Sequence, residues 1–197
     1  MQFEIEFEAS HLDRMMEAIR REIATPEEML GSIGESLLRV NRRRHEAGVD
    51  PEGKDWKALS PLTLGSAVWK NQDESFRKSK SLSIEAARKI RSKRGGVLKD
   101  SGRMLASFNY QVSSDTLVLG FDGARDAKLA GWHHGGTDPY TILPKDKKAL
   151  SFAGIITKRV NHPGLPKREL VGFPDSDKNL VENVTADHLL RVLQRVR

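Results

Sequence analysis

The chain has 197 residues and a mass of 22.1 kDa, a size that favours one domain, or one domain with an arm. It contains no cysteine, which excludes a disulfide framework, a thiolate metal site and a thiol nucleophile. The net charge of +6 and the pI of about 9.6 favour contact with anionic surfaces but say nothing about the fold.

The chain begins with a segment of alternating character. Residues 2–8, QFEIEFE, place Phe or Ile at every second position between polar residues, which predicts a half-buried strand. This start lacks the basic residues and the apolar run of a signal peptide. The apolar runs elsewhere are too short to span a bilayer. We therefore expect no signal peptide and no membrane contact.

Two helices are predicted to follow this strand. Ser10 and Thr25 each precede an acidic residue at the third helical position, so we expect both to cap helices. Pro26 suits the first helical position of the second helix. That helix is expected to end near Gly48, after the basic cluster at residues 42–44.

The middle of the chain changes in composition. Residues 49–63 are rich in turn residues and predict a loop, with Trp56 and Leu59 packing back on the core and a short helix opening at Ser60-Pro61. From about 70 to 97 basic residues dominate and apolar residues are sparse. This pattern predicts an inserted basic arm that becomes ordered against a partner.

The second half alternates short elements with turns. We expect a short helix leading into a strand over 97–110, then a β-hairpin that continues to residue 121, with Val112, Leu117 and Leu119 facing the core. Residues 124–136 predict a short helix ending in glycines, and 139–144, 149–155 and 156–160 predict short strands that build or extend the hairpin's sheet. A closing helix is predicted from Pro174-Asp175.

This order of elements favours an α+β fold in a single domain over residues 1–197. The expected arrangement is a small antiparallel sheet containing the β-hairpin. It packs against N-terminal helices and a C-terminal helix, and the basic arm is inserted at about 70–97.

The stretch His133-His134-Gly135-Gly136 is the most enzyme-like part of the sequence. With His162 and Asp138 it could supply ligands for zinc, as in a metal-dependent hydrolase. Adjacent side chains diverge on a helix or strand, however, and rarely converge on one ion. We favour Trp132 and one His packing beneath the following loop while the other His bonds to backbone. We expect no catalytic residue, no metal and no cofactor, and hence no enzyme.

The basic clusters favour a different hypothesis, which is non-specific contact with nucleic acid. A solvated helix face, with positive charge near a helix C-terminus, explains part of this pattern equally well. The residues expected to contact DNA or a partner are Arg42, Arg43, Arg44, Lys78, Lys80, Arg88, Lys89, Arg91, Lys93 and Arg94.

Residues 161–178, NHPGLPKRELVGFPDSDK, predict a rigid strap ahead of the last helix. Pro163 and Pro166 restrict the backbone, so little entropy is lost on docking. Pro166 lacks an N–H, so we expect this segment to run along a surface and not within a sheet. Arg168 is expected to bind a carboxylate on a neighbouring subunit or on the closing helix. The alternative is that the strap only fastens the last helix to the sheet.

Several of these pieces, taken in order, resemble the phage virion morphogenesis family, the tail completion proteins of Mu-like and P2-like phages. The matching pieces are Gly53-x-x-Trp56-x-x-Leu59-Ser60-x-x-Thr63, Leu98-x-x-Ser101-Gly102-x-Met104-x-x-Ser107-Phe108, Val118-x-Gly120, Ala130-Gly131-Trp132-His133-His134-Gly135-Gly136, and the run from Leu165 to Phe173.

The resemblance implies a structural protein of the phage neck that completes the tail or joins it to the head. It implies a ring, most simply a hexamer, with the tail terminator, tail tube and head-closure or connector proteins as partners and packaged DNA as a further contact. It implies a location in the virion, after assembly in the host cytoplasm. The expected subunit or partner interface is formed by Trp132, His133, His134, Leu165, Pro166, Lys167 and Arg168.

Overall fold

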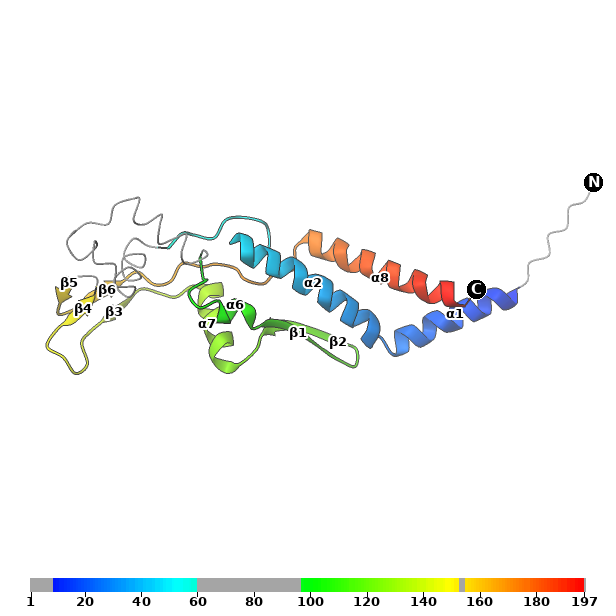
Figure 1. Ribbon diagram of the computed structural model, residues 1–197, viewed down its shortest axis with the longest axis horizontal. Coiled ribbons are helices and arrows are strands. Elements are labelled where there is room, and N and C mark those ends of the chain that lie inside the picture. The colour runs from blue at the N-terminus through cyan, green and yellow to red at the C-terminus, as the bar shows by residue number, and fades with distance from the viewer. Residues whose placement is uncertain (1–8, 60–96, 153–154, 197) are drawn as a thin grey trace, which may run out of the picture. The chain divides into compact units, whose positions relative to one another are not determined.

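The computed structural model describes residues 9–59, 97–152 and 155–196. Helices come first, strands with one helix among them follow, and a helix closes the chain, which is the order expected of an α+β fold (Figure 1). The described elements are α1 (Ala9–Ala24), α2 (Glu27–Ala47), α6 (Arg103–Ala106), β1 (Phe108–Ser113), β2 (Thr116–Phe121), α7 (Ala124–Gly135), β3 (Tyr140–Ile142), β4 (Leu150–Phe152), β5 (Ile155–Thr157), β6 (Val160–His162) and α8 (Asp175–Arg195). The α+β prediction is confirmed.

The chain forms two compact units. The first comprises residues 1–40, 109–120 and 173–197, and the second comprises residues 41–108 and 121–172. Helix α2 and the hairpin strands contribute residues to both. The expectation of a single domain stays a prediction.

In the first unit, α1 and α8 pack against each other. Their contact includes a hydrogen bond of 2.6 Å between His188 Nε2 and Glu22 Oε1, and the His188 side chain is buried. The hairpin packs on α2 where Gly34 meets the ring of Tyr110, since a Cβ at Gly34 would lie 2.7 Å from Tyr110 Cε2. The predicted hairpin is confirmed, and Val112, Leu117 and Leu119 are half-buried.

The predicted starts of the first two helices are wrong in detail. Ser10 lies inside α1, so it does not cap this helix. The Thr25 hydroxyl donates to the carbonyl of Arg21 at 3.1 Å, so it serves the end of α1 and does not cap α2. The carbonyl of Pro26 accepts the bond from Leu30 N–H at 2.8 Å, which makes Pro26 the residue before the helix and not its first residue. The closing helix begins at Asp175 as predicted.

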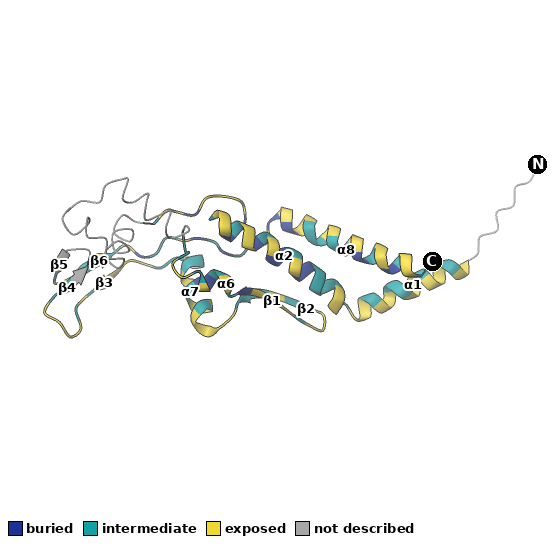
Figure 2. Cartoon of the chain, viewed as in Figure 1, coloured by how far each residue is buried: buried dark blue, intermediate teal, exposed yellow. Residues whose placement is uncertain are grey.

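The core of the second unit is built from segments far apart in sequence. Trp56, Met104, Ala130 and Leu170 are buried together, and partly buried apolar residues surround them (Figure 2). The expectation that Trp56 packs back on the core is confirmed. The short helix expected after residue 97 is α6, and the helix expected at 124–136 is α7.

The short strands of the second unit pair only with one another. Strand β3 pairs with β6, matching Tyr140 with His162 and Ile142 with Val160, and β4 pairs with β5, matching Leu150 with Thr157. Among the described residues these ladders are separate from the β1–β2 pair. The expectation that they extend the hairpin's sheet is therefore wrong, because each strand finds its partner locally within residues 140–162.

Three predictions lie outside the described residues. They are the strand over residues 2–8, the helix opening at Ser60-Pro61, and the basic arm at about 70–97 except for Val97. Within the described helices, no segment combines the length and the apolar character needed to cross a bilayer.

Candidate functional site

The candidate site lies in the second unit, where residues 164–171 of the predicted strap cross the end of α7. From here on, the strap means these eight residues. Thr137 N–H donates to the Leu165 carbonyl at 3.0 Å, and Leu165 N–H donates to Thr137 Oγ1 at 2.8 Å. Further along, Arg168 N–H donates to the His133 carbonyl at 2.8 Å. As expected, the strap runs outside any strand and is held by these bonds.

Two glycines permit this close crossing. Gly136 has a φ of 77°, and a Cβ there would lie 2.8 Å from the Leu165 carbonyl oxygen. Gly164 has a φ of 85°, and a Cβ there would overlap the Thr137 carbonyl and lie 2.9 Å from that of Asp138. Only glycine adopts this backbone conformation without strain and leaves this space. Gly136, the second glycine after the twin histidines, therefore permits the close approach of the strap backbone.

The twin histidines have different partners. His134 Nδ1 accepts a hydrogen bond from Leu170 N–H at 3.2 Å, so one His bonds to backbone as expected. His133 is half-buried, and its Nδ1 has no hydrogen-bond partner among the described residues. Burial, and then the charge of Arg168, lower the pKa of His133. Trp132 does not pack beneath the loop: 47% of it is exposed, and Lys128 Nζ lies 5.2 Å from its ring centroid.

Arg168 is the buried charge of the site. It is only 4% exposed, and its Nε donates to the Lys57 carbonyl at 2.9 Å while Nη2 lies 3.4 Å from the Ala58 carbonyl. Burial lowers the pKa of Arg168, but a guanidinium stays charged in proteins. The expected carboxylate partner on the closing helix is therefore replaced by loop carbonyls, which compensate the buried charge.

The carbonyls of the strap are bound from its other side. Trp56 Nε1 donates to the Glu169 carbonyl at 2.9 Å, and His45 Nε2 lies 2.7 Å from the Leu170 carbonyl. The His45 ring meets Phe108 edge-on at 5.1 Å and stacks on Phe121 at 6.0 Å between ring centroids. Burial is the main cause that lowers the pKa of His45, which favours a neutral ring with its proton on Nε2.

Sequence reasoning missed His45, which directly follows the basic cluster at residues 42–44. A usable signal was present. Ile33, Leu37, Asn41 and His45 recur every four residues and are all buried, so His45 continues the covered face of α2.

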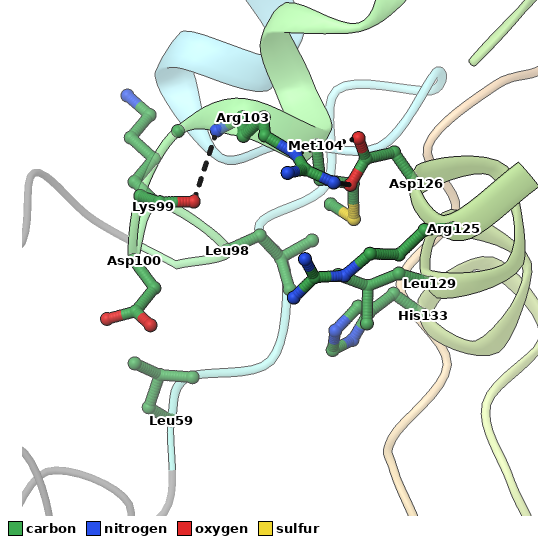
Figure 3. Close-up of a pocket in the computed structure, with 12 residues that line it drawn as sticks. Leu59, Leu98, Lys99, Asp100, Arg103, Met104, Arg125, Asp126, Leu129 and His133 are labelled. Atoms are coloured by element: carbon green, nitrogen blue, oxygen red, sulfur yellow. Dashed lines mark hydrogen bonds and ion pairs between the residues drawn. The ribbon is translucent and has the colours of Figure 1, made fainter. Parts of the chain in front are cut away.

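A pocket of ≈560 Å³ lies beside this site (Figure 3). Its wall carries an ion pair between Arg103 Nε and Asp126 Oδ2 at 3.0 Å, and the Arg125 side chain extends across it toward Leu98. The lining residues are Leu59, Leu98, Lys99, Asp100, Ser101, Gly102, Arg103, Met104, Arg125, Asp126, Leu129 and His133.

The structure brings the seven predicted interface residues together, since three come from the end of α7 and four from the strap. Leu165 and Pro166 are half-buried, and Lys167 is exposed with its Nζ paired to Glu169. The bonds between the two groups are intramolecular and attach the strap to the end of α7. They do not test whether the strap fastens the last helix to the sheet. Their contact with a partner stays a prediction.

The other predicted residues are more scattered. Arg42 Nη2 donates to the Phe108 carbonyl at 3.2 Å, Arg43 is exposed and Arg44 is half-buried. The remaining basic candidates lie outside the described residues, and they are Lys78, Lys80, Arg88, Lys89, Arg91, Lys93 and Arg94.

Two of the candidate zinc ligands, His134 and His162, have other partners. His162 Nδ1 accepts the Gly164 N–H at 3.0 Å, and the His162 ring stacks on Tyr140 at 4.8 Å between centroids. Across residues 9–59, 97–152 and 155–196, no group of three or more His, Asp or Glu side chains is placed to hold a metal ion.

Comparison with known proteins gives one match. A family model described as the phage virion morphogenesis family matches residues 7–190. No curated protein and no solved structure matches the chain significantly. The matched range contains the strap, the end of α7, the loop around Trp56 and His45. Because the match extends over nearly the whole sequence, this chain belongs to the phage virion morphogenesis family, whose members serve in building the phage particle.

Proposed function

We propose that this protein is a structural component of the phage neck that completes the tail or joins it to the DNA-filled head. It acts as a ring, most simply a hexamer, between the tail terminator, the tail tube and the head-closure or connector proteins. The observation that carries this proposal is the family match over residues 7–190.

The described surface is consistent with assembly. Helix α1 leaves Leu12, Met16 and Ile23 between 47% and 63% exposed, at spacings of four and seven residues that put them on one side of the helix. Apolar side chains gathered on one surface are typical of interaction sites. A neighbouring subunit would cover this stripe, and the strap site of the second unit would keep its internal bonds.

The ring is tested by the native mass of the purified protein, measured by light scattering and sedimentation at micromolar concentration. We expect a closed oligomer of about six copies for the wild type. A homogeneous monomer over the whole concentration range would contradict the ring.

The contribution of α1 is tested by a matched pair of variants. Met16→Gln/Ile23→Gln removes the apolar stripe, and we expect it to shift the mass toward the monomer. Arg14→Gln/Arg21→Gln changes exposed residues on the opposite side of the same helix and should leave the mass unchanged. Equal native masses for the two variants would show that the apolar stripe of α1 does not contribute to the ring contact.

The place in the particle is tested by infection with phage that lacks this gene. We expect filled heads and separate tails in electron micrographs, with joined particles restored by the wild-type protein supplied in the host. Complete particles in the absence of the protein would overturn the proposed role.

A further inference from the structure

The β3–β6 and β4–β5 ladders are separate two-stranded pairs that follow one another along the chain, and together they are here called the ribbon. Residues 138–152 and 155–162 are here called the β-arm. The β3–β6 ladder ends at the pair Ile142–Val160, and the β4–β5 ladder begins at the pair Leu150–Thr157. Seven residues, 143–149, therefore lie opposite only two, Lys158 and Arg159 (Figure 1). The strand pairing therefore places residues 143–149 and residues 158–159 at the same position, between the two ladders.

This point carries a dense positive charge. Lys145, Lys147 and Lys148 come from the longer segment, Lys158 and Arg159 come from the shorter one, and all five are exposed. Asp146 is the single acid among these nine residues. No ion pair joins any of the five cations to a described residue. Like charges so close together repel, and an anionic partner would offset that repulsion.

The side chains of this cluster favour nucleic acid over protein as the partner. Four of the five cations are lysines, and Lys is depleted at protein–protein interfaces. Lysine binds phosphate as a point charge without needing the planar geometry with which Arg pairs with carboxylates. A two-stranded ribbon also fits the major groove of DNA, which is about 12 Å wide.

We propose that the β-arm is a sequence-independent binding surface for the phosphate backbone of double-stranded DNA. The contact is made by the five cations of segments 143–149 and 158–159. It does not depend on the ring, because the residues that carry it all lie within one compact unit of one chain.

The test measures binding of the full chain to a 30-base-pair duplex by fluorescence anisotropy between about 50 and 200 mM NaCl. Five phosphate contacts predict that log K falls with log salt concentration with a slope of about −4.5. Lys145→Gln/Lys147→Gln/Lys148→Gln should reduce the magnitude of this slope by about 2.7, and Lys158→Gln/Arg159→Gln by about 1.8. Two duplexes of unrelated sequence should bind alike.

Two control variants make the test specific. Lys145→Arg/Lys147→Arg/Lys148→Arg keeps the charges and should keep the slope. Arg20→Gln/Arg39→Gln/Arg191→Gln removes the same number of charges from exposed positions on α1, α2 and α8, and should leave the slope nearly unchanged. Circular dichroism checks that each variant is folded.

Several results would overturn the proposal. The first is no binding at 50 mM NaCl. The second is an unchanged slope in the β-arm variants, which would assign binding to basic residues elsewhere, such as those at 70–97. The third is displacement of DNA by polyglutamate at equal charge concentration, which would indicate an acidic protein partner. None of these results bears on the native mass of the protein, so the ring proposal is tested independently of the DNA-binding proposal.

Discussion

The backbone of Gly164 passes so close to the carbonyl of Thr137 that no space remains for a Cβ atom between them. Replacing Gly164 by Ala should therefore force the strap away from α7, in addition to straining a φ of 85°. We expect a loss of at least about 2 kcal/mol in the free energy of unfolding, measured by urea denaturation.

Gly53→Ala is the matched control for that substitution. Gly53 has a φ of 83°, but a Cβ there would meet nothing within 4 Å. Only the backbone strain applies, so the expected loss is about 1 kcal/mol. Equal losses for the two variants would show that the crossing of strap and α7 contributes nothing.

Arg168 and Lys167 are neighbours in sequence with opposite environments. Arg168→Met removes the donor to the Lys57 and Ala58 carbonyls, and we expect a loss of roughly 2–3 kcal/mol in the free energy of unfolding. Lys167 is exposed, so Lys167→Gln should change stability by less than about 0.5 kcal/mol.

Arg168→Met and Lys167→Gln also distinguish an internal fastening role of the strap from contact of the strap with a partner. If the strap also binds a neighbouring subunit, Lys167→Gln should weaken the oligomer at unchanged stability. A folded Arg168→Met protein with wild-type stability but a lower native mass would contradict the internal role of Arg168.

The buried histidines predict a loss of stability in mild acid. The folded state lowers the pKa of His45 and His133 below 6.5, so the unfolded chain binds protons first as the pH falls. Stability is thus fully present above about pH 7 and declines below about pH 6.5, by at most about 1.4 kcal/mol per pH unit for each residue.

His45→Gln tests this prediction directly. Glutamine keeps an N–H donor for the Leu170 carbonyl but does not titrate, so the decline between pH 7.5 and pH 5.5 should become shallower. The measurement is urea denaturation across that range. An identical decline in the variant would show that His45 is not a source of the pH dependence.

Two glycines of α2 should respond oppositely to alanine. Gly31→Ala meets nothing within 4 Å and should stabilise the helix by about 0.5–1 kcal/mol. Gly34→Ala would collide with the Tyr110 ring and should be destabilising by about 1–3 kcal/mol. The thermal midpoints should move in opposite directions, and Tyr110→Leu should relieve part of the Gly34→Ala loss. A stabilising Gly34→Ala would mean that the hairpin does not pack closely here.

The sequence predicted those elements whose signals are local. The closing helix and the hairpin have their turn residues and apolar spacing within a short window, and both form where expected. The grouping of the strap with the end of α7 followed from the resemblance, and the structure brings these residues together. The apparent capping box at Thr25 failed because α2 begins at Glu27, so Pro26 and not Thr25 is the residue before the helix.

Non-local contacts were beyond the reach of the sequence. His45 and Leu170 are 125 positions apart, and no pattern in either segment indicates the other. The pairing of β3 with β6 instead of with the hairpin depends on which partner lies nearby in space, which short apolar runs do not reveal. Arg168 was expected to bind a carboxylate, but its acceptors are backbone carbonyls, which every residue type carries and no sequence pattern marks.

The paired bonds between Thr137 and Leu165 bring together the two ends of the chain segment that forms the β-arm. The buried core residues of the second unit all lie outside this segment, so the segment can be replaced without removing core contacts. Lengthening such a loop costs little, since the entropy of closure grows only with the logarithm of its length. The length and charge of the β-arm could therefore differ between related phages while the rest of the fold stays the same.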